Sequence, residues 1–82
     1  MDLLSGLIDE NTLKVLSLFL KKPDEFFHIN GVSSKTKVPL ATTFRIMKNL
    51  TKNNIISYKE ISKFKVYHLA KNNKTKQLGK LL

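Results

Sequence analysis

The sequence predicts a mainly α-helical domain with one small β-hairpin. Apolar residues recur at helical spacing over residues 10–21, and two further helical segments, 29–36 and 40–53, flank a three-residue break. After residue 55 the apolar spacing changes from helical to extended. No single segment is diagnostic. Their order, however, is that of a helix, a helix-turn-helix, a β-wing and a short C-terminal helix.

The first predicted helix covers residues 10–21. Asp9 or Asn11 can cap its start by accepting backbone N–H bonds, and Pro23 prevents its continuation. One face is apolar and should form the floor of the core: Leu13, Leu16, Phe19 and Leu20, widened by Val15 and Leu18.

Two helices on either side of a tight turn are predicted next. Residues 29–36 have weak helix propensity but suit a short supporting helix, with Val32 facing inward. Pro39 cannot extend that helix, but it fits the first turn of the next one, 40–53. The inward stripe of this longer helix is Thr43, Ile46, Met47 and Leu50, and the opposite face carries Ala41, Thr42, Arg45, Lys48 and Lys52.

Extended structure is expected after the left-handed turn that Asn53-Asn54 allows. β-branched and aromatic residues dominate 55–69, with Ser62-Lys63 as the turn of a hairpin. Residues 26–29 fit either a further short strand or an extended lead-in to the helix that follows. A last short helix is predicted over 75–82.

The chain is short enough to need outside support. Its 82 residues, 41% of them hydrophobic, make one predicted domain, 1–82. Cysteine is absent, which excludes a disulfide framework, a Cys-ligated zinc site and a thiol nucleophile. We therefore expect a homodimer, with residues 1–9 and 71–82 as possible dimerisation extensions. The apolar residues that would serve are Leu3, Leu4, Leu7, Ile8, Leu78, Leu81 and Leu82.

The basic charge of the chain is concentrated in one part. Residues 1–26 carry three lysines and five acids, a net charge of −2, whereas 27–82 carry eleven lysines and Arg45 against Glu60, a net charge of +11. The predicted helix-turn-helix and wing would therefore be drawn to phosphate. A merely well-solvated Lys-rich surface does not predict this asymmetry.

The stretch 38–56 resembles the winged helix-turn-helix regulators of the ArsR/MarR broad class. Arg45, Met47, Leu50, Asn54 and the aliphatic pair Ile55-Ile56 stand at the places of that pattern, and Val66-Tyr67-His68-Leu69 resembles the returning wing strand. Asn54 stands where Gly is usual, and Pro39-Leu40-Ala41 where polar residues are common, which implies weaker base recognition. Metal sensing is not implied, because the only histidines are His28 and His68.

The resemblance implies a DNA-binding transcriptional regulator. Helix 40–53 would enter the major groove of double-stranded DNA, and the wing 57–67 would lie on the flanking backbone or minor groove. The predicted DNA-binding residues are Thr42, Arg45, Lys48, Lys52, Lys35, Lys37, Ser34, Lys63 and Lys65. Arg45 can pair with a guanine edge, although a phosphate or an acidic side chain is an equally good partner. Each lysine is as often solvated as bound.

Phe64 lies near the predicted wing tip, where polar residues are usual. Packing onto its own hairpin is favoured over stacking on a base or sugar, or contact with a partner protein.

Other classes of function find little support in the sequence. No paired carboxylates, Gly-rich phosphate loop or catalytic histidine pairing is apparent, so we expect no enzyme, cofactor, metal or small-molecule ligand. Signal-peptide and membrane-span patterns are also missing, which predicts a cytoplasmic protein. The alternative function is an architectural or protein-interaction winged helix that binds nucleic acid without sequence preference. RNA binding is a third possibility.

Overall fold

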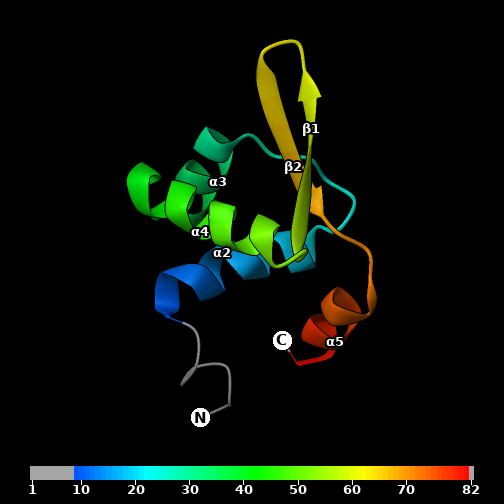
Figure 1. Cartoon of the computed structure of the whole chain (residues 1–82). Helices are drawn as coiled ribbons and strands as arrows, with labels where there is room; N and C mark the ends of the chain where they lie inside the picture. The colour runs from blue at the N-terminus through cyan, green and yellow to red at the C-terminus, as the bar shows by residue number, and fades with distance from the viewer. Residues whose placement is uncertain (1–8, 82) are drawn as a thin grey trace.

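The computed structural model describes residues 9–81 as three helices, a hairpin and a final helix. The elements in chain order are α2 (Glu10–Lys21), α3 (Ile29–Thr36), α4 (Leu40–Lys52), β1 (Ile56–Ile61), β2 (Phe64–Leu69) and α5 (Asn73–Leu81). Figure 1 shows the hairpin projecting away from the helices, with α5 at the opposite end of the molecule. Within residues 9–81 no helix has the length and apolar character needed to cross a membrane.

Helix α2 forms the floor of the core, as predicted. Asp9 caps it, because the Thr12 backbone N–H donates to the Asp9 carboxylate at 2.7 Å. Its buried face is centred on Val15, Leu16 and Phe19. The predicted stripe was therefore slightly misplaced: Leu13 and Leu20 are only half-buried, and Val15 is fully buried.

The turn between α3 and α4 is organised around Val38, whose side chain is buried. The Val38 carbonyl accepts hydrogen bonds from Ser33 Oγ at 2.6 Å and Thr43 Oγ1 at 3.2 Å. The Val38 N–H donates to Thr36 Oγ1 at 3.3 Å. Lys37 turns the chain in a left-handed conformation, with φ of 65°. Hydroxyls from both helices thus satisfy the polar backbone of a turn that lies in the core.

Helix α4 buries the predicted stripe of Thr43, Ile46, Met47 and Leu50. It ends at Lys52, one residue earlier than expected, because Asn53 is the cap and Asn54 adopts the left-handed conformation with φ of 61°. The prediction that an asparagine would close this helix is confirmed.

The hairpin pairs Ile56 with Leu69 at its base and Ile61 with Phe64 at its tip. Ser62, with φ of 57°, makes the predicted turn. Phe27 and Tyr67 exchange two backbone hydrogen bonds of 2.8 Å, so the open alternative at 26–29 is resolved as a single bridge rather than a third strand. Ile56 and Leu69 join the core, while the outer part of the hairpin extends into solvent.

Helix α5 begins two residues earlier than predicted. Asn72 Oδ1 accepts a hydrogen bond from the Thr75 N–H at 3.0 Å, and Thr75 Oγ1 accepts one from the Asn72 N–H at 3.1 Å, so the two residues cap the helix reciprocally. Asn72 Nδ2 and Lys74 Nζ also donate to the carbonyls of Asn54 and Asn53. These bonds fasten the start of α5 to the end of α4.

The Val38 turn predicts non-additive effects of two hydroxyl deletions. Ser33→Ala or Thr43→Val alone should lower the free energy of unfolding by about 1 kcal/mol, because the other hydroxyl still satisfies the Val38 carbonyl. The double variant leaves that carbonyl without a hydrogen bond. Its loss of free energy of unfolding should exceed the sum of the two single losses by roughly 0.5 kcal/mol or more. Urea unfolding of all four proteins checks this, with the exposed Ser34→Ala as control. Strictly additive losses would contradict it.

Candidate nucleic-acid interface

The outer face of α4 is basic and exposed. Arg45, Lys48 and Lys52 all reach solvent on the side opposite the buried stripe, as predicted. Thr42 lies at the edge of this face and is half-buried. Phe44, whose side chain is 60% exposed, lies beside the basic residues and was missed by the sequence analysis. The sequence could have indicated its exposure, because Phe44 is a large apolar residue outside the inward stripe of an amphipathic helix.

A first groove runs between α4 and the hairpin, and we call it the helix groove. Its aromatic and basic lining residues are Phe44, Lys48, Lys52, Tyr58, Lys65 and Tyr67. The Lys65 ammonium lies 4.7 Å from the centroid of the Tyr58 ring, close enough for a cation–π interaction. Tertiary structure therefore brings one wing lysine beside two lysines of α4.

A second groove adjoins the outer half of β2 and the start of α3, and we call it the wing groove. Its volume is about 860 Å³, and its side chains include His28, Lys35, Phe44, Lys63, Phe64 and Lys65. Phe44 lines both grooves, so the two form a continuous surface between the helices and the wing.

Both grooves are positively charged without compensation. No aspartate or glutamate among residues 9–81 lines either one. Glu10, Asp24 and Glu25 instead form exposed ion pairs with Lys14, Lys71 and Lys22. Glu60 is the cross-strand neighbour of Lys65 on the same face of the hairpin, but it lines neither groove. The field over the grooves therefore attracts an anion.

Arg45 shares the exposed face of α4 with Lys52 but does not line the helix groove. It lines a separate hollow with Asp9, Thr12, Asn49 and Asn53. The Thr12 backbone N–H holds the pKa of Asp9 below 3.8, and the positive charge of Arg45 lowers the Asp9 pKa further by a smaller amount. The exposed face of α4 thus borders two different surroundings: the helix groove is purely basic, and the second hollow combines an arginine with a carboxylate and two amides.

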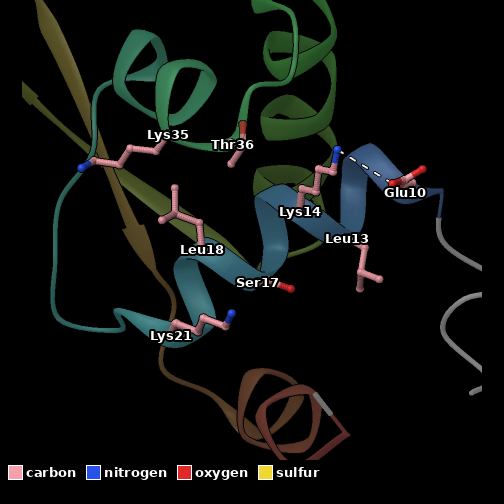
Figure 2. Close-up of a pocket in the computed structure, with 8 residues that line it drawn as sticks. All are labelled: Glu10, Leu13, Lys14, Ser17, Leu18, Lys21, Lys35 and Thr36. Atoms are coloured by element: carbon pink, nitrogen blue, oxygen red, sulfur yellow. Dashed lines mark ion pairs between the residues drawn. The ribbon is translucent and has the colours of Figure 1, made fainter.

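The predicted residues of α3 and its turn lie apart from the outer face of α4. Ser34, Lys35 and Lys37 are exposed, and of these Lys35 lines the wing groove. Lys35 also borders a hollow along α2, where it extends away from the Lys14–Glu10 pair of 3.9 Å (Figure 2). That hollow carries both signs of charge and does not extend the basic surface.

Phe64 does not pack as expected. Its side chain is 65% exposed, and its aromatic neighbour is His28, edge-on with ring centroids 6.1 Å apart. The expected packing of Phe64 onto its own hairpin is therefore wrong, because the tip of the wing extends beyond the core. His68 is half-buried in β2, and no cluster of three metal-ligand side chains occurs among residues 9–81.

The predicted dimerisation residues are only partly described. Leu78 is half-buried and Leu81 is 64% exposed on α5. Leu3, Leu4, Leu7, Ile8 and Leu82 lie outside the described residues.

Comparison with known proteins finds likeness in structure but not in sequence. The chain matches no protein-family model. It matches no curated protein either. Among solved structures, the ferric uptake regulator of Francisella tularensis with iron superposes with a TM-score of 0.74 at 22% identity, over 80% of this chain and 55% of that one. A possible transcriptional regulator from Methanosarcina mazei Go1 gives 0.72 at 20% identity, over 90% and 66%.

A third similar structure is a homodimeric winged helix-turn-helix DNA-binding domain from Mycobacterium bovis, described as a possible ArsR-family transcriptional regulator. Its TM-score is 0.70 at 16% identity, with 93% of this chain and 67% of that fragment covered. These likenesses confirm the predicted winged helix fold. The chain spans about half of the ferric uptake regulator and two thirds of the other two.

The contacts of Asp9 predict a pH effect. Because its folded-state pKa is lowered, the stabilisation from its carboxylate is present above the unfolded-state value of 3.8 and is lost as the pH falls through the folded-state value. Asp9→Asn keeps a helix cap without the titrating group, so its stability should fall less than that of the wild type over this range. Urea unfolding at successive pH values measures the difference.

Nuclear magnetic resonance titration in Arg45→Gln provides the matching check. The Asp9 pKa should rise slightly but stay below 3.8, because the Thr12 hydrogen bond remains. An unchanged Asp9 pKa in this variant, or parallel acid destabilisation of wild type and Asp9→Asn, would count against the described geometry.

Proposed function

We propose that this protein is a DNA-binding transcriptional regulator that places α4 in the major groove of double-stranded DNA. The observation that carries the proposal is the uncompensated basic surface formed jointly by α4 and the hairpin. A helix with an exposed basic face, held beside a basic wing, has the shape and charge for a groove and its flanking phosphates. The fold shared with possible transcriptional regulators supports the same function.

Each predicted residue then has a distinct role. Arg45, on the side of α4 that also has amides, reads base edges, with Thr42 beside it. Lys48, Lys52 and Lys65 hold phosphates and thereby set the position of the helix without specifying sequence. The remaining residues contact the backbone from the supporting helix and the wing: Ser34, Lys35, Lys37 and Lys63.

The proposal includes a homodimer. Two recognition helices related by a two-fold axis would reach successive major grooves, about 34 Å apart. Leu81 leaves an apolar side chain on α5 in solvent, and α5 packs on α2 at the end of the molecule away from the wing. The structurally similar Mycobacterium bovis domain is homodimeric, which supports this arrangement.

One observation favours the alternative of binding without sequence preference. The outer face of α4 includes Leu40, 49% exposed, and Phe44, 60% exposed, at positions near its start. Apolar side chains offer base edges no hydrogen bonds, so Arg45 would carry most of the recognition.

Two substitutions separate these functions. Arg45→Ala should reduce the preference for a selected duplex over a random one, at a cost of about 1–3 kcal/mol on the selected duplex. Lys63→Ala should weaken binding to both duplexes equally. It should also reduce the magnitude of the slope of log affinity against log salt concentration by about 0.9. Fluorescence anisotropy over a salt series provides both quantities. Equal binding of all duplexes by the wild type would establish the non-specific function, and a flat salt response would contradict DNA binding altogether.

The dimer is tested by placing charge on α5. Leu81→Glu should shift the protein toward monomer in sedimentation analysis, because a buried unpaired carboxylate opposes association. Lys76→Glu, on the opposite side of the same helix, should leave the dimer intact. A wild-type protein that sediments as a monomer at micromolar concentration would contradict the proposed homodimer.

A further inference from the structure

Two phenylalanine rings are exposed on the basic surface. Phe44 on α4 is 60% exposed and Phe64 at the start of β2 is 65% exposed, and both line the wing groove. Neither belongs to the hydrophobic core. The groove thus combines apolar rings with cationic side chains, namely Lys35, Lys63 and Lys65.

Their backbone setting presents these rings to solvent. Phe64 is the first residue of β2, directly after the turn, and pairs with Ile61, beyond the part of the hairpin that reaches the core. Phe44 lies between the buried stripe and the outer basic face of α4. His28, exposed at the start of α3, meets the Phe64 ring edge-on and leaves most of that ring uncovered. Folding therefore leaves both rings available for contact.

Fully paired DNA cannot use such rings well. In a duplex the faces of the bases are stacked on one another, and only their edges and the phosphates are accessible from the grooves. An unpaired base presents its whole π-face and can stack on an aromatic side chain. A cationic groove with aromatic rings is the combination that holds a single strand, with the lysines on the phosphates and the rings on the bases.

We propose that the wing groove binds an unpaired DNA strand adjoining the duplex that α4 engages. Phe44 and Phe64 are the stacking residues, and Lys35, Lys63 and Lys65 lie on the phosphates of the junction, where the duplex backbone continues into that strand. The absence of any acidic side chain lining this groove, among residues 9–81, makes an anionic occupant the complementary one. This inference rests on the proposed function for the position of the duplex, and it makes duplex–single-strand junctions the preferred ligand.

The test compares one DNA stem-loop duplex in two forms, with a blunt end or with a short single-stranded oligothymidine tail. Both carry the same fluorophore, tails of both polarities are used, and anisotropy is measured at fixed salt. The tailed duplex should bind more tightly than the blunt one, and one stacked base corresponds to a gain of about 5-fold or more. Phe64→Ala should remove most of this gain while the affinity for the blunt duplex stays unchanged.

Matched variants separate stacking from general damage to the wing. Phe64→Trp should preserve the gain, because a larger ring still stacks. Ile61→Ala removes an exposed apolar side chain from the same end of the hairpin and should also preserve it. Phe44→Ala should reduce the gain from the other side of the groove. Circular dichroism confirms that each exposed-site variant remains folded.

The outcomes are distinct. A tail that adds no affinity, or an equal loss of the gain in Ile61→Ala, overturns the stacking site and leaves the groove to an apolar partner. Failure to bind the blunt duplex would instead sink the proposed regulator. In that case the binding of free oligothymidine is measured for the wild type and for Phe64→Ala. Binding by the wild type that Phe64→Ala loses supports the single-strand site. Absence of binding by the wild type overturns it.

Discussion

The geometry of the whole domain depends on the buried carbonyl of Val38. A backbone acceptor removed from water must be satisfied, and here hydroxyls from the helix before it and the helix after it both donate to it. That requirement fixes the direction in which α4 leaves the turn. Since α4 supplies the central stripe of the core, its direction also determines where the hairpin begins and which side of α4 remains in solvent.

The basic surface is a consequence of that arrangement rather than of any one segment. Lysines of α4 and of β2 lie far apart in the sequence, yet they line one groove because the hairpin returns beside the helix. The Tyr58 ring lies under the Lys65 ammonium and holds it near the helix. Among residues 9–81, Glu10, Asp24 and Glu25 form ion pairs elsewhere and no acidic side chain lines the groove, so its positive charges add.

Two chemically different hollows border the exposed face of helix α4. Lys48 and Lys52 face the wing, where a point charge on a flexible stem suits phosphate. Arg45 lines the other hollow, together with the Asp9 carboxylate and the amides of Asn49 and Asn53. Under the proposed function this division would separate positioning from recognition on one helix, and Phe44 lines both grooves. In the proposed single-strand site the exposed rings would add contacts to unpaired bases.

The sequence by itself determined the order of the elements, the buried stripe of α4 and the turns at Asn54 and Ser62, because periodicity and left-handed propensity are local properties. It also located the excess of positive charge. Tertiary structure alone decided that Arg45 and the helix lysines line different hollows, that Phe44 and Phe64 share one groove, and that residues 26–29 make one bridge. Those facts depend on how segments distant in the chain pack together, and no local pattern carries that information.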